Sequence, residues 1–411
     1  MNAPWTVNGE RLWEALMAMA QIGATPRGGV CRLALTDADR EARDLFVRWA
    51  REAGCRVEVD QMGNLFARRP GKEDHLPPVL TGSHLDSQPT GGKFDGAYGV
   101  LAALEVVRTL NDLRCETRRP IEVVVWTNEE GSRFAPAMIA SGVFAGEFSL
   151  DYGLSRCDRD GVSIGQELDR IGYAGPRPCG GQPVHAYFEA HIEQGPILEA
   201  EGKTIGVVLG IQGIRWVDCT LEGTAAHAGT TPLPARRDAL LGAARVIQAA
   251  SEVAAAHAPE ARTTVGELRV HPNSRNVIPG RVDFTLDLRH PHAETLQAMS
   301  EALRAAFDRV CAEQRLAGQW QEIWYAPPTA FDPDCIAAVR RAAERLGLPH
   351  RDIISGAGHD AKYLAQVCPT AMIFIPCRDG LSHNEAEAIS PADAAAGASV
   401  LLHAVLEKAQ E

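Results

Sequence analysis

Histidines and carboxylates occur together in four short segments whose composition suits metal binding and proton transfer. Residues 81–87 read T-G-S-H-L-D-S, and residues 91–96 follow with G-G-K-F-D-G. Residues 126–134, W-T-N-E-E-G-S-R-F, hold two adjacent carboxylates directly after an apolar run. Adjacent carboxylates at a strand end are costly unless a cation compensates them, so this pair is a candidate for one metal ligand and one proton carrier.

Two further segments each add one histidine. Residues 189–195 read E-A-H-I-E-Q-G and residues 381–385 read L-S-H-N-E. Each segment alone also has an ordinary explanation, as a glycine-rich turn, a solvated acidic turn or a structural histidine. Taken together, six side chains fall at predicted strand ends or loops in the outer parts of the chain: His84, Asp86, Asp95, Glu130, His191 and His383. Mixed imidazole and carboxylate ligands suit zinc, and manganese, cobalt or nickel less exclusively.

The elements that must position these residues follow an alternating pattern. Helices are predicted at 9–22, 36–53 and 100–110, and strands at 56–60, 64–68, 79–84 and 121–127. The run at 121–127 is rich in β-branched residues, which is typical of a strand buried on both faces of a mainly parallel sheet. A strand is also predicted at 371–376. Alternating strands and helices predict a doubly wound α/β domain, and ligands gather at the carboxyl ends of strands in such a sheet.

The middle of the chain follows a different order. Strands are predicted at 213–222, 263–270, 281–289 and 319–325, with helices at 235–256 and 292–317. This βαββαβ order is the ferredoxin-like pattern and predicts a small inserted α+β domain. We therefore expect a discontinuous catalytic domain at 1–212 and 326–411, interrupted by a lid or dimerisation domain at 213–325.

The composition limits the kinds of partner. The 411 residues carry a net charge of -12, which argues against nucleic acid and anionic membranes as partners. A local group of arginines still permits a small anionic substrate. The start of the chain lacks the pattern of a signal peptide, and the longest apolar runs have strand length. The 10 cysteines form no C-x-x-C pair, so we expect free thiols and a cytoplasmic location.

Seven motifs in order give the chain a specific resemblance. They are G-S-H-x-D-S, G-G-x-x-D-G, N-E-E-G-x-R-F, H-I-E-Q-G-P, A-H-A-G-T-T-P, R-N-V-I-P-G and S-H-N-E, and they span most of the sequence. The pattern resembles the hydantoinase/carbamoylase branch of the M20 metallopeptidase superfamily. That branch includes N-carbamoyl-L-amino acid hydrolases, metal-dependent β-ureidopropionases and allantoate amidohydrolases. The resemblance implies two divalent metal ions per subunit, most often zinc, and a homodimer formed through the lid domain.

The resemblance also implies roles for individual residues. His84 and His191 complete one metal site, Glu130 and His383 complete the other, and Asp95 bridges the two ions. Glu129 is then the general base. Asp86 is expected to hydrogen-bond to His84 and fix its tautomer.

In the inserted domain, the resemblance implies three further functional residues. His227 polarises the scissile carbonyl, generally in the partner's active site, while Asn276 and Arg289 bind the substrate carboxylate. Arginine offers a bidentate fork that matches a carboxylate, although Arg289 also fits a simple strand-end ion pair. In the catalytic domain, further substrate contacts are expected at Gln194, Gly358 and His359, with a structural role for His359 equally open.

The implied reaction is hydrolysis of the N-carbamoyl C–N bond of a small amino acid, which yields the amino acid, carbon dioxide and ammonia. Residues 86–95 are more similar to the carbamoylase and β-ureidopropionase forms, which favours this activity over hydrolysis of allantoate or ureidoglycolate. Those two compounds also carry carboxylate and ureido groups. The H-I-E-Q-G-P and A-H-A-G-T-T-P segments favour an amidase over an M20 aminopeptidase or deacylase. A non-catalytic binding protein on the same fold is the remaining alternative, and the retention of Glu129 and of every expected ligand argues against it.

Overall fold

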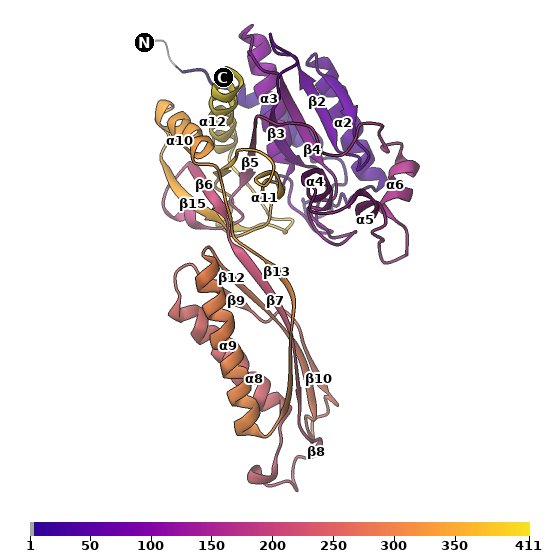
Figure 1. The fold of residues 1–411 in the computed structure, drawn as a ribbon, viewed down its shortest axis with the longest axis vertical. Helices are drawn as coiled ribbons and strands as arrows, with labels where there is room; N and C mark the ends of the chain where they lie inside the picture. Colours follow the sequence, from indigo (N-terminus) through magenta and orange to yellow (C-terminus); the bar gives the residue numbers. More distant parts are fainter. Residues whose placement is uncertain (1–3) are drawn as a thin grey trace. The chain divides into compact units, whose positions relative to one another are not determined.

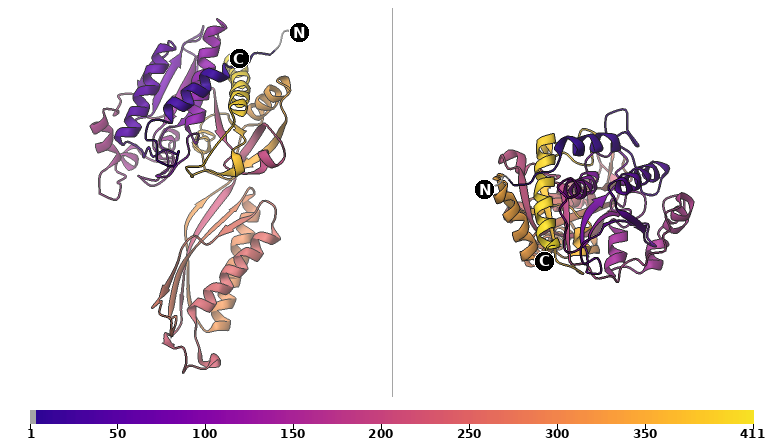
Figure 2. Two further views of the ribbon diagram at one scale, coloured as in Figure 1. Left: turned by 180° about the vertical axis from the view of Figure 1, so that it is seen from behind. Right: turned by 90° about the horizontal axis from the view of Figure 1, so that it is seen from above.

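The structure is a computed structural model that describes residues 4–411. The chain divides into two compact units, which are coloured by sequence in Figures 1 and 2. Unit 1 comprises the chain up to Gly210 together with Ala330–Glu411, and unit 2 comprises Ile211–Thr329.

Unit 1 is built on a nine-stranded mixed sheet with the order β1-β2-β4-β3-β5-β16-β6-β14, in which β15 also pairs with β6. The strands are β1 (Arg56–Val59), β2 (Leu65–Arg69), β3 (Val79–His84), β4 (Ile121–Trp126), β5 (Ala186–Ile192), β6 (Ile205–Ile211), β14 (Thr329–Ala330), β15 (His350–Ser355) and β16 (Thr370–Ile375).

The central strands β4, β3, β5 and β16 run parallel to one another. Every residue of these four strands is buried, including the run Val123–Trp126, as expected for strands covered by helices on both faces. Their carboxyl ends therefore lie along one edge of the sheet. The mainly parallel α/β architecture predicted for the catalytic domain is confirmed, although β5 and its buried Glu189 and His191 were not predicted as a strand.

Helices flank this sheet. They are α1 (Gly9–Met19), α2 (Asp37–Glu52), α3 (Ala97–Asp112), α4 (Ile139–Ala145), α5 (Leu150–Leu154), α6 (Ile164–Ile171), α7 (Ile197–Ala200), α10 (Pro333–Arg345), α11 (Ala361–Leu364) and α12 (Pro391–Ala409). Thr36, the first residue of the helix predicted at 36–53, caps α2 through its side chain, which accepts the amide of Asp39. Helix α12 contacts α1, α3 and α10, and α1 also contacts α3; α12 (yellow) lies beside α10 (orange) in Figure 2.

Unit 2 contains a five-stranded antiparallel sheet with the order β10-β12-β7-β13, in which β9 also pairs with β12. Its elements are β7 (Gly213–Glu222), β8 (Ala226–His227), α8 (Ala239–Ala256), β9 (Arg262–Thr264), β10 (Leu268–His271), β11 (Val277–Ile278), β12 (Arg281–His290), α9 (Ala293–Gln314) and β13 (Ala317–Ala326). The single strand predicted at 263–270 is interrupted and forms β9 and β10. Strands β8 and β11 pair separately.

Buried and more exposed side chains alternate along β12, and the buried ones form part of the core of unit 2. Val282, Phe284, Leu286 and Leu288 are buried, and they share a core cluster with residues of α8 and α9. Helix α8 is the one helix among the described residues that is long and apolar enough for a membrane span by length and composition. Four of its buried residues, Ala239, Ala243, Val246 and Ala250, belong to this same core cluster, which gives its apolar face a packing role.

Candidate metal centre and active site

The predicted metal-binding residues meet where the four parallel strands end. His84 is the last residue of β3, and His191 lies one residue before the end of β5. Glu129 and Glu130 follow β4 after two residues, and His383 lies in the loop after β16. Strand order therefore brings together side chains that are up to about three hundred positions apart in the sequence, as expected for the carboxyl edge of a parallel sheet.

The two buried histidines are oriented in the same way. Nδ1 of His84 lies 2.9 Å from the carbonyl oxygen of Asp86, and Nδ1 of His191 lies 2.9 Å from that of Ile192. Because a carbonyl oxygen only accepts, each Nδ1 must donate its proton. The Nε2 atoms are left facing the carboxylate of Asp95, at 3.5 Å for His84 and 3.2 Å for His191. This is the arrangement by which a backbone acceptor orients a metal-ligating histidine.

Asp95 lies between two groups of ligands. Its Oδ1 faces His84 and His191, and its Oδ2 lies 3.5 Å from Nε2 of His383. His383 in turn lies 3.3 Å from Oε2 of Glu130, whose orientation is held by Gln88 at 2.7 Å. In each of the two trios, His84–Asp95–His191 and Asp95–Glu130–His383, the potential ligand atoms lie within 4.8 Å of one another.

Gly96 makes the close approach of these segments possible. Its φ is +65°, and a Cβ at this position would lie 2.4 Å from the ring of His84. Any other residue would therefore displace the imidazole. The amide of Gly96 also donates to Nε2 of His191 at 3.2 Å.

The charges of the site fit divalent cations. Burial disfavours the imidazolium form of His84, but the nearby carboxylates of Glu129, Asp95 and Asp86 outweigh it and raise the pKa of His84 well above its ordinary value. Burial likewise opposes ionisation of Asp95, yet its hydrogen bonds with His191 and His84 hold the pKa of Asp95 well below its ordinary value. The buried carboxylates thus require positive charge beside them. A nitrogen and oxygen ligand set of this kind suits zinc-type ions.

Glu129 is placed for proton transfer. The residue is 7% exposed and its Oε2 lies 3.4 Å from Nε2 of His84. Burial raises the pKa of Glu129 well above its ordinary value, and Asp360 and Glu130 add to this effect while His84 opposes it. A carboxylate with a raised pKa is suited to accepting a proton near neutral pH.

The structure corrects the expected contact of Asp86. The proton of His84 is accepted by the backbone carbonyl of Asp86, and the Asp86 carboxylate lies 3.8 Å from Nδ1. The carboxylate instead accepts the backbone amides of Glu129 and Glu130, each at 3.2 Å. Asp86 therefore holds both the loop after β3 and the loop after β4. Arg32, which is fully buried, donates to the carbonyl of Leu85 at 3.0 Å and supports the same segment.

Gln194, expected to contact substrate, lies against the bridging carboxylate. Its Nε2 donates to Oδ2 of Asp95 and to the hydroxyl of Ser382, both at 3.0 Å. Its Oε1 is buried and accepts no hydrogen bond among the described residues. Ser382 also donates to Asp95 at 3.0 Å, so a single network joins the loops that carry Asp95 and His383.

Glu387 belongs to this network and was missed in the sequence. Its Oε1 accepts the amides of Phe94 at 2.9 Å and Asp95 at 3.1 Å, and its Oε2 lies 3.3 Å from the Ser382 hydroxyl. The residue is 3% exposed. The sequence signal was its position close after His383, and Glu385, two residues after His383, is also close but accepts the hydroxyl of Thr25 instead.

His359, expected to contact substrate or to be structural, lies beside a metal-site histidine. Its ring centroid is 4.5 Å from that of His191, and its Nε2 lies 2.9 Å from the hydroxyl of Ser355. Burial and the neighbouring His191 hold the pKa of His359 well below its ordinary value, which favours the neutral ring. A Cβ at Gly358 would lie 3.0 Å from Cε of Met138, the flexible end of that side chain.

The remaining predicted residues lie in unit 2, where His227 has a defined tautomer. The amides of Gly229 and Thr230 point at Nδ1 of His227, at 3.0 and 3.2 Å. Nδ1 must therefore accept, and in the neutral ring the proton resides on Nε2 of an exposed side chain. This leaves His227 as a hydrogen-bond donor to whatever it contacts.

Asn276 lies next to His227, whereas Arg289 lies at the other end of the sheet. The carbonyl of Asn276 accepts the amide of Ala228 at 2.9 Å, and Asn276 precedes the Arg281 end of β12. Arg289 is eight residues further along β12, which corresponds to roughly 26 Å at the usual strand rise. Figure 1 shows β8 and β9 at these opposite ends, and β9 pairs with Arg289. Within one chain, Asn276 and Arg289 are thus too far apart to bind one carboxylate.

Arg289 has a carboxylate partner within its own strand. Its Nε and Nη2 donate to the two oxygens of Asp287, each at 2.9 Å, and Asp287 also accepts the indole N–H of Trp216 at 2.9 Å. This bidentate contact occupies Nε and Nη2 of Arg289, and it is the strand-end ion pair that the sequence left open as the alternative to substrate binding.

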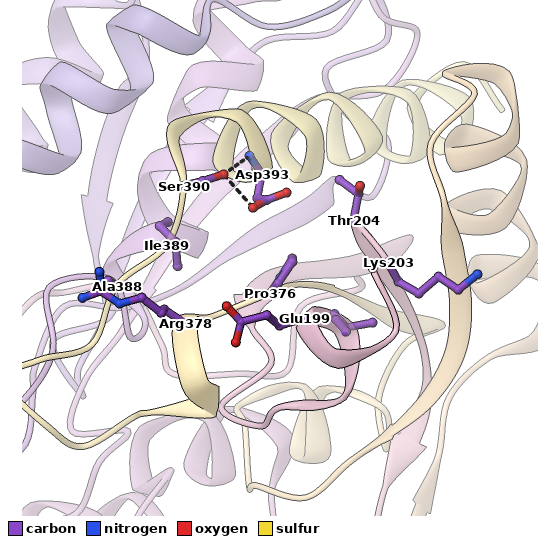
Figure 3. Close-up of a pocket in the computed structure, with 11 residues that line it drawn as sticks. Glu199, Lys203, Thr204, Pro376, Arg378, Ala388, Ile389, Ser390 and Asp393 are labelled. Carbon is purple, nitrogen blue, oxygen red and sulfur yellow. Dashed lines mark hydrogen bonds between the residues drawn. The ribbon is translucent and has the colours of Figure 1, made fainter.

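A separate cavity of about 450 Å³ lies in unit 1 (Figure 3). Residues of the chain before β6, after β16 and in the first turn of α12 line it, including Lys203, Arg378 and Asp393. The Ser390 hydroxyl donates to Asp393 at 2.6 Å and accepts its amide at 3.0 Å, as Figure 3 shows, so the start of α12 is capped within the chain. Among the described lining residues, none is a predicted site residue.

Comparisons with known proteins agree with this geometry. Residues 80–407 match the model of "Peptidase family M20/M25/M40". The chain is 52% identical to an N-carbamoyl-L-amino-acid amidohydrolase of Rhizobium meliloti, with 98% of this chain and 97% of the relative covered. It is 34% identical to an allantoate amidohydrolase of Bacillus subtilis, with 90% of each covered. A solved amidase of the hydantoinase/carbamoylase family from Burkholderia multivorans is 64% identical, with 99% of each chain covered and a TM-score of 0.96.

Proposed function

The chain belongs to peptidase family M20/M25/M40, and from that premise we propose that it is an N-carbamoyl amino acid amidohydrolase. It is a metal-dependent hydrolase of C–N bonds outside peptides, and its substrate is a small molecule. The observation that carries the proposal is the position of Asp95 between the His84–His191 pair and the Glu130–His383 pair. One carboxylate shared between two ligand groups is what a two-ion centre requires.

We assign the ligands of two zinc ions to these groups. His84 and His191 would hold one ion, Glu130 and His383 would hold the other, and Asp95 would be the ligand that the two groups share. When bound, such a pair supplies an acidified water and polarises the carbonyl of the substrate. The raised pKa values of His84, His191 and His383 support this assignment, because each imidazole already lies where neighbouring carboxylates favour positive charge.

Glu129 moves the proton in this proposal. It accepts a proton from the attacking water and passes it to the amino nitrogen as the C–N bond breaks. The carbamate product then decomposes to carbon dioxide and ammonia. Asp86 maintains the geometry by holding the backbone amides of Glu129 and Glu130.

Residues of unit 2 bind and polarise the substrate. The Nε2–H of His227 donates to the carbamoyl oxygen as negative charge develops there. Arg289 and Asn276 bind the carboxylate and direct the ureido group toward the metals. Since Asn276 and Arg289 lie at opposite ends of one sheet, the site requires residues from two copies of the chain. We therefore propose a homodimer in which His227 and Asn276 act in the partner's site.

The cellular location is proposed on the state of the thiols. All 10 cysteines are free in the structure. This supports a reducing cytoplasm, as expected from the sequence.

The test is ammonia release from a substrate panel. The panel contains N-carbamoyl-L-α-amino acids, N-carbamoyl-β-alanine, allantoate and ureidoglycolate, each assayed with zinc, manganese or cobalt. We expect the highest kcat/KM with an N-carbamoyl amino acid. The second candidate is allantoate hydrolysis, favoured by the relative at 34% identity, and a higher kcat/KM for allantoate would establish it instead.

A further inference from the structure

The turn that follows His227 is held by one arginine. Strand β8 places His227 opposite Val277 of β11, and the chain then reverses so that the amide of Thr231 donates to the carbonyl of His227 at 3.2 Å. The amides of Gly229 and Thr230 thereby point at the imidazole. The direction of these two amides determines which ring nitrogen carries the proton.

We infer that Arg236 is a positioning residue that fixes His227 as an Nε2–H donor by holding this turn. The Nη2 of Arg236 donates to the carbonyl of Ala228 at 2.7 Å, and its Nε donates to the carbonyl of Thr231 at 3.0 Å. These two carbonyls flank the two amides that face Nδ1. The inference rests on the proposed function, because it assigns Arg236 a role only through His227.

The planar guanidinium is what this contact requires. Two donors of Arg236 reach two carbonyls that are three residues apart, and the side chain is half-buried. A lysine carries the same charge as one compact ammonium and lacks the rigid fork that spans both acceptors. Loss of the clamp frees the turn, so the amides of Gly229 and Thr230 no longer select Nδ1 as the acceptor, and the exposed imidazole samples both tautomers.

The neighbouring Arg237 provides a matched control. It follows Arg236 directly, but its Nε donates to the carbonyl of Arg315, away from the His227 turn. R237K therefore removes an arginine fork from the same segment without touching Ala228 or Thr231.

The experiment compares R236K, R236Q and R237K in the full-length, zinc-loaded protein. We measure melting temperature, zinc content, kcat and KM for N-carbamoyl amino acids, and the 15N shifts of the His227 ring, which are assigned by their loss in H227N. In R236K we expect kcat to fall by about 10- to 100-fold, the usual effect of removing a partner that orients a functional histidine. KM and zinc content should match R237K, and the His227 ring should show both tautomers.

Different results separate this inference from the proposed function. Wild-type kcat and a single Nε2–H tautomer in R236K would overturn the role of Arg236 while H227N remains impaired. Wild-type turnover in H227N would instead refute the proposed role of His227, and the ring shifts of R236K would still decide whether Arg236 fixes the imidazole. R236Q keeps the readout available if R236K alone fails to fold.

Discussion

At the scale of single residues, the candidate site depends on how protons are distributed among its histidines. His84 and His191 each donate Nδ1–H to a backbone carbonyl, so their Nε2 atoms carry the lone pair that a metal ion would need, although Nε2 of His191 accepts the Gly96 amide in this structure. His227 has the opposite tautomer, because two amides occupy its Nδ1. Backbone groups therefore fix the histidine tautomer in both units. The tautomer suits metal binding in unit 1 and hydrogen-bond donation from Nε2 in unit 2.

Glu129→Gln tests the general base at this scale. The amide cannot accept the proton of the attacking water, so we expect kcat to fall by about 10²- to 10⁴-fold, the usual contribution of general acid–base catalysis. Zinc content, measured by atomic emission, should stay at the wild-type level because Glu129 is not an assigned ligand. Near wild-type turnover with both metals bound would reject this role.

Arg289→Lys tests the carboxylate clamp. Lysine loses the bidentate contact, so we expect KM for N-carbamoyl amino acids to rise by about 10- to 100-fold, since hydrogen bonds to charged groups contribute about 1.5–3 kcal/mol. The matched control is R281K at the other end of β12, where Arg281 pairs with Asp283 in the same i, i+2 arrangement. An equal rise in KM for an uncharged N-carbamoyl amino acid amide would count against the clamp.

At the scale of elements, the site is made by loops that several side chains tie together. Glu387 joins the Asp95 loop to the His383 loop, because it accepts two amides of the first and its Oε2 lies 3.3 Å from the Ser382 hydroxyl of the second. Gly92 leaves the space for its carboxylate, because a Cβ at Gly92 would lie 2.0 Å from Cδ of Glu387. The metal ligands are thus positioned by contacts between loops as well as by the strands that precede them.

Gly92→Ala is expected to weaken metal binding without removing any ligand. The methyl group displaces Glu387 from the amides of Phe94 and Asp95, and loss of such supporting partners commonly costs about 10- to 100-fold in metal affinity. Chelator competition measures the affinity, and E387Q should give a loss in the same direction. Gly266→Ala, where nothing lies within 4 Å of the added Cβ, is the control. Unchanged zinc affinity in both G92A and E387Q would contradict this account.

The pH dependence of stability is predicted for the C-terminal helix. In α12, Nε2–H of His403 donates to the carbonyl of Trp5 at 2.9 Å, and Nδ1 lies 3.5 Å from Nη1 of Arg345. Burial and the charge of Arg345 lower the pKa of His403 below its unfolded value near 6.5, so the unfolded chain binds this proton first. The contribution of His403 is therefore complete above pH 6.5 and is lost as the pH falls below it.

Melting temperatures of wild type and H403Q between pH 8 and pH 5 check this expectation. With EDTA present in both samples to remove metal effects, the wild type should lose more stability on acidification than H403Q, since glutamine retains an N–H donor without titrating. Parallel curves would show that His403 does not contribute to the pH dependence.

Periodicity and motif spacing predicted much of this architecture, and the exceptions have physical causes. Strands β3 and β7 were predicted to the residue because their apolar residues and their flanking turns are unambiguous. Strand β5 was not predicted, because Glu189 and His191 lie in a fully buried strand and their polarity hides its apolar pattern. Glu189 is accommodated by the hydroxyls of Ser83 and Tyr187, at 2.7 and 3.0 Å, partners that no local pattern reveals. The candidate metal ligands were predicted because motifs mark them, whereas Glu387 becomes visible only through long-range contacts.

At the scale of the whole molecule, the proposed active site is distributed over two chains. His227 and Asn276 lie beyond one end of the sheet of unit 2 and Arg289 lies at the other, so a single copy offers each substrate only part of the set. A cyclic dimer satisfies this requirement, because each subunit gives to its partner the residues that it receives.

Complementation between two inactive variants tests this arrangement. When H227N and E129Q subunits are co-expressed with different tags, the mixed dimer has one site with an intact Glu129 and an intact His227 from its partner. We expect such purified mixed dimers to show about half of the wild-type activity per dimer, since one of two symmetric sites is complete. Mixed dimers as inactive as both parents would show that His227 acts in its own subunit.

The length of β12 has a consequence for how sequences of this type can change. Its 10 residues set the distance between the Asn276 end and the Arg289 end of the sheet, which in the proposed dimer serve different active sites. Inserting two residues preserves the inward and outward alternation of side chains that buries Phe284 and Leu286, so the sheet would still fold. The distance between the two ends of β12 would, however, increase by about 7 Å. Proteins with such an insertion would retain the metal-binding residues and the dimer, but they would bind substrates of the original size more weakly.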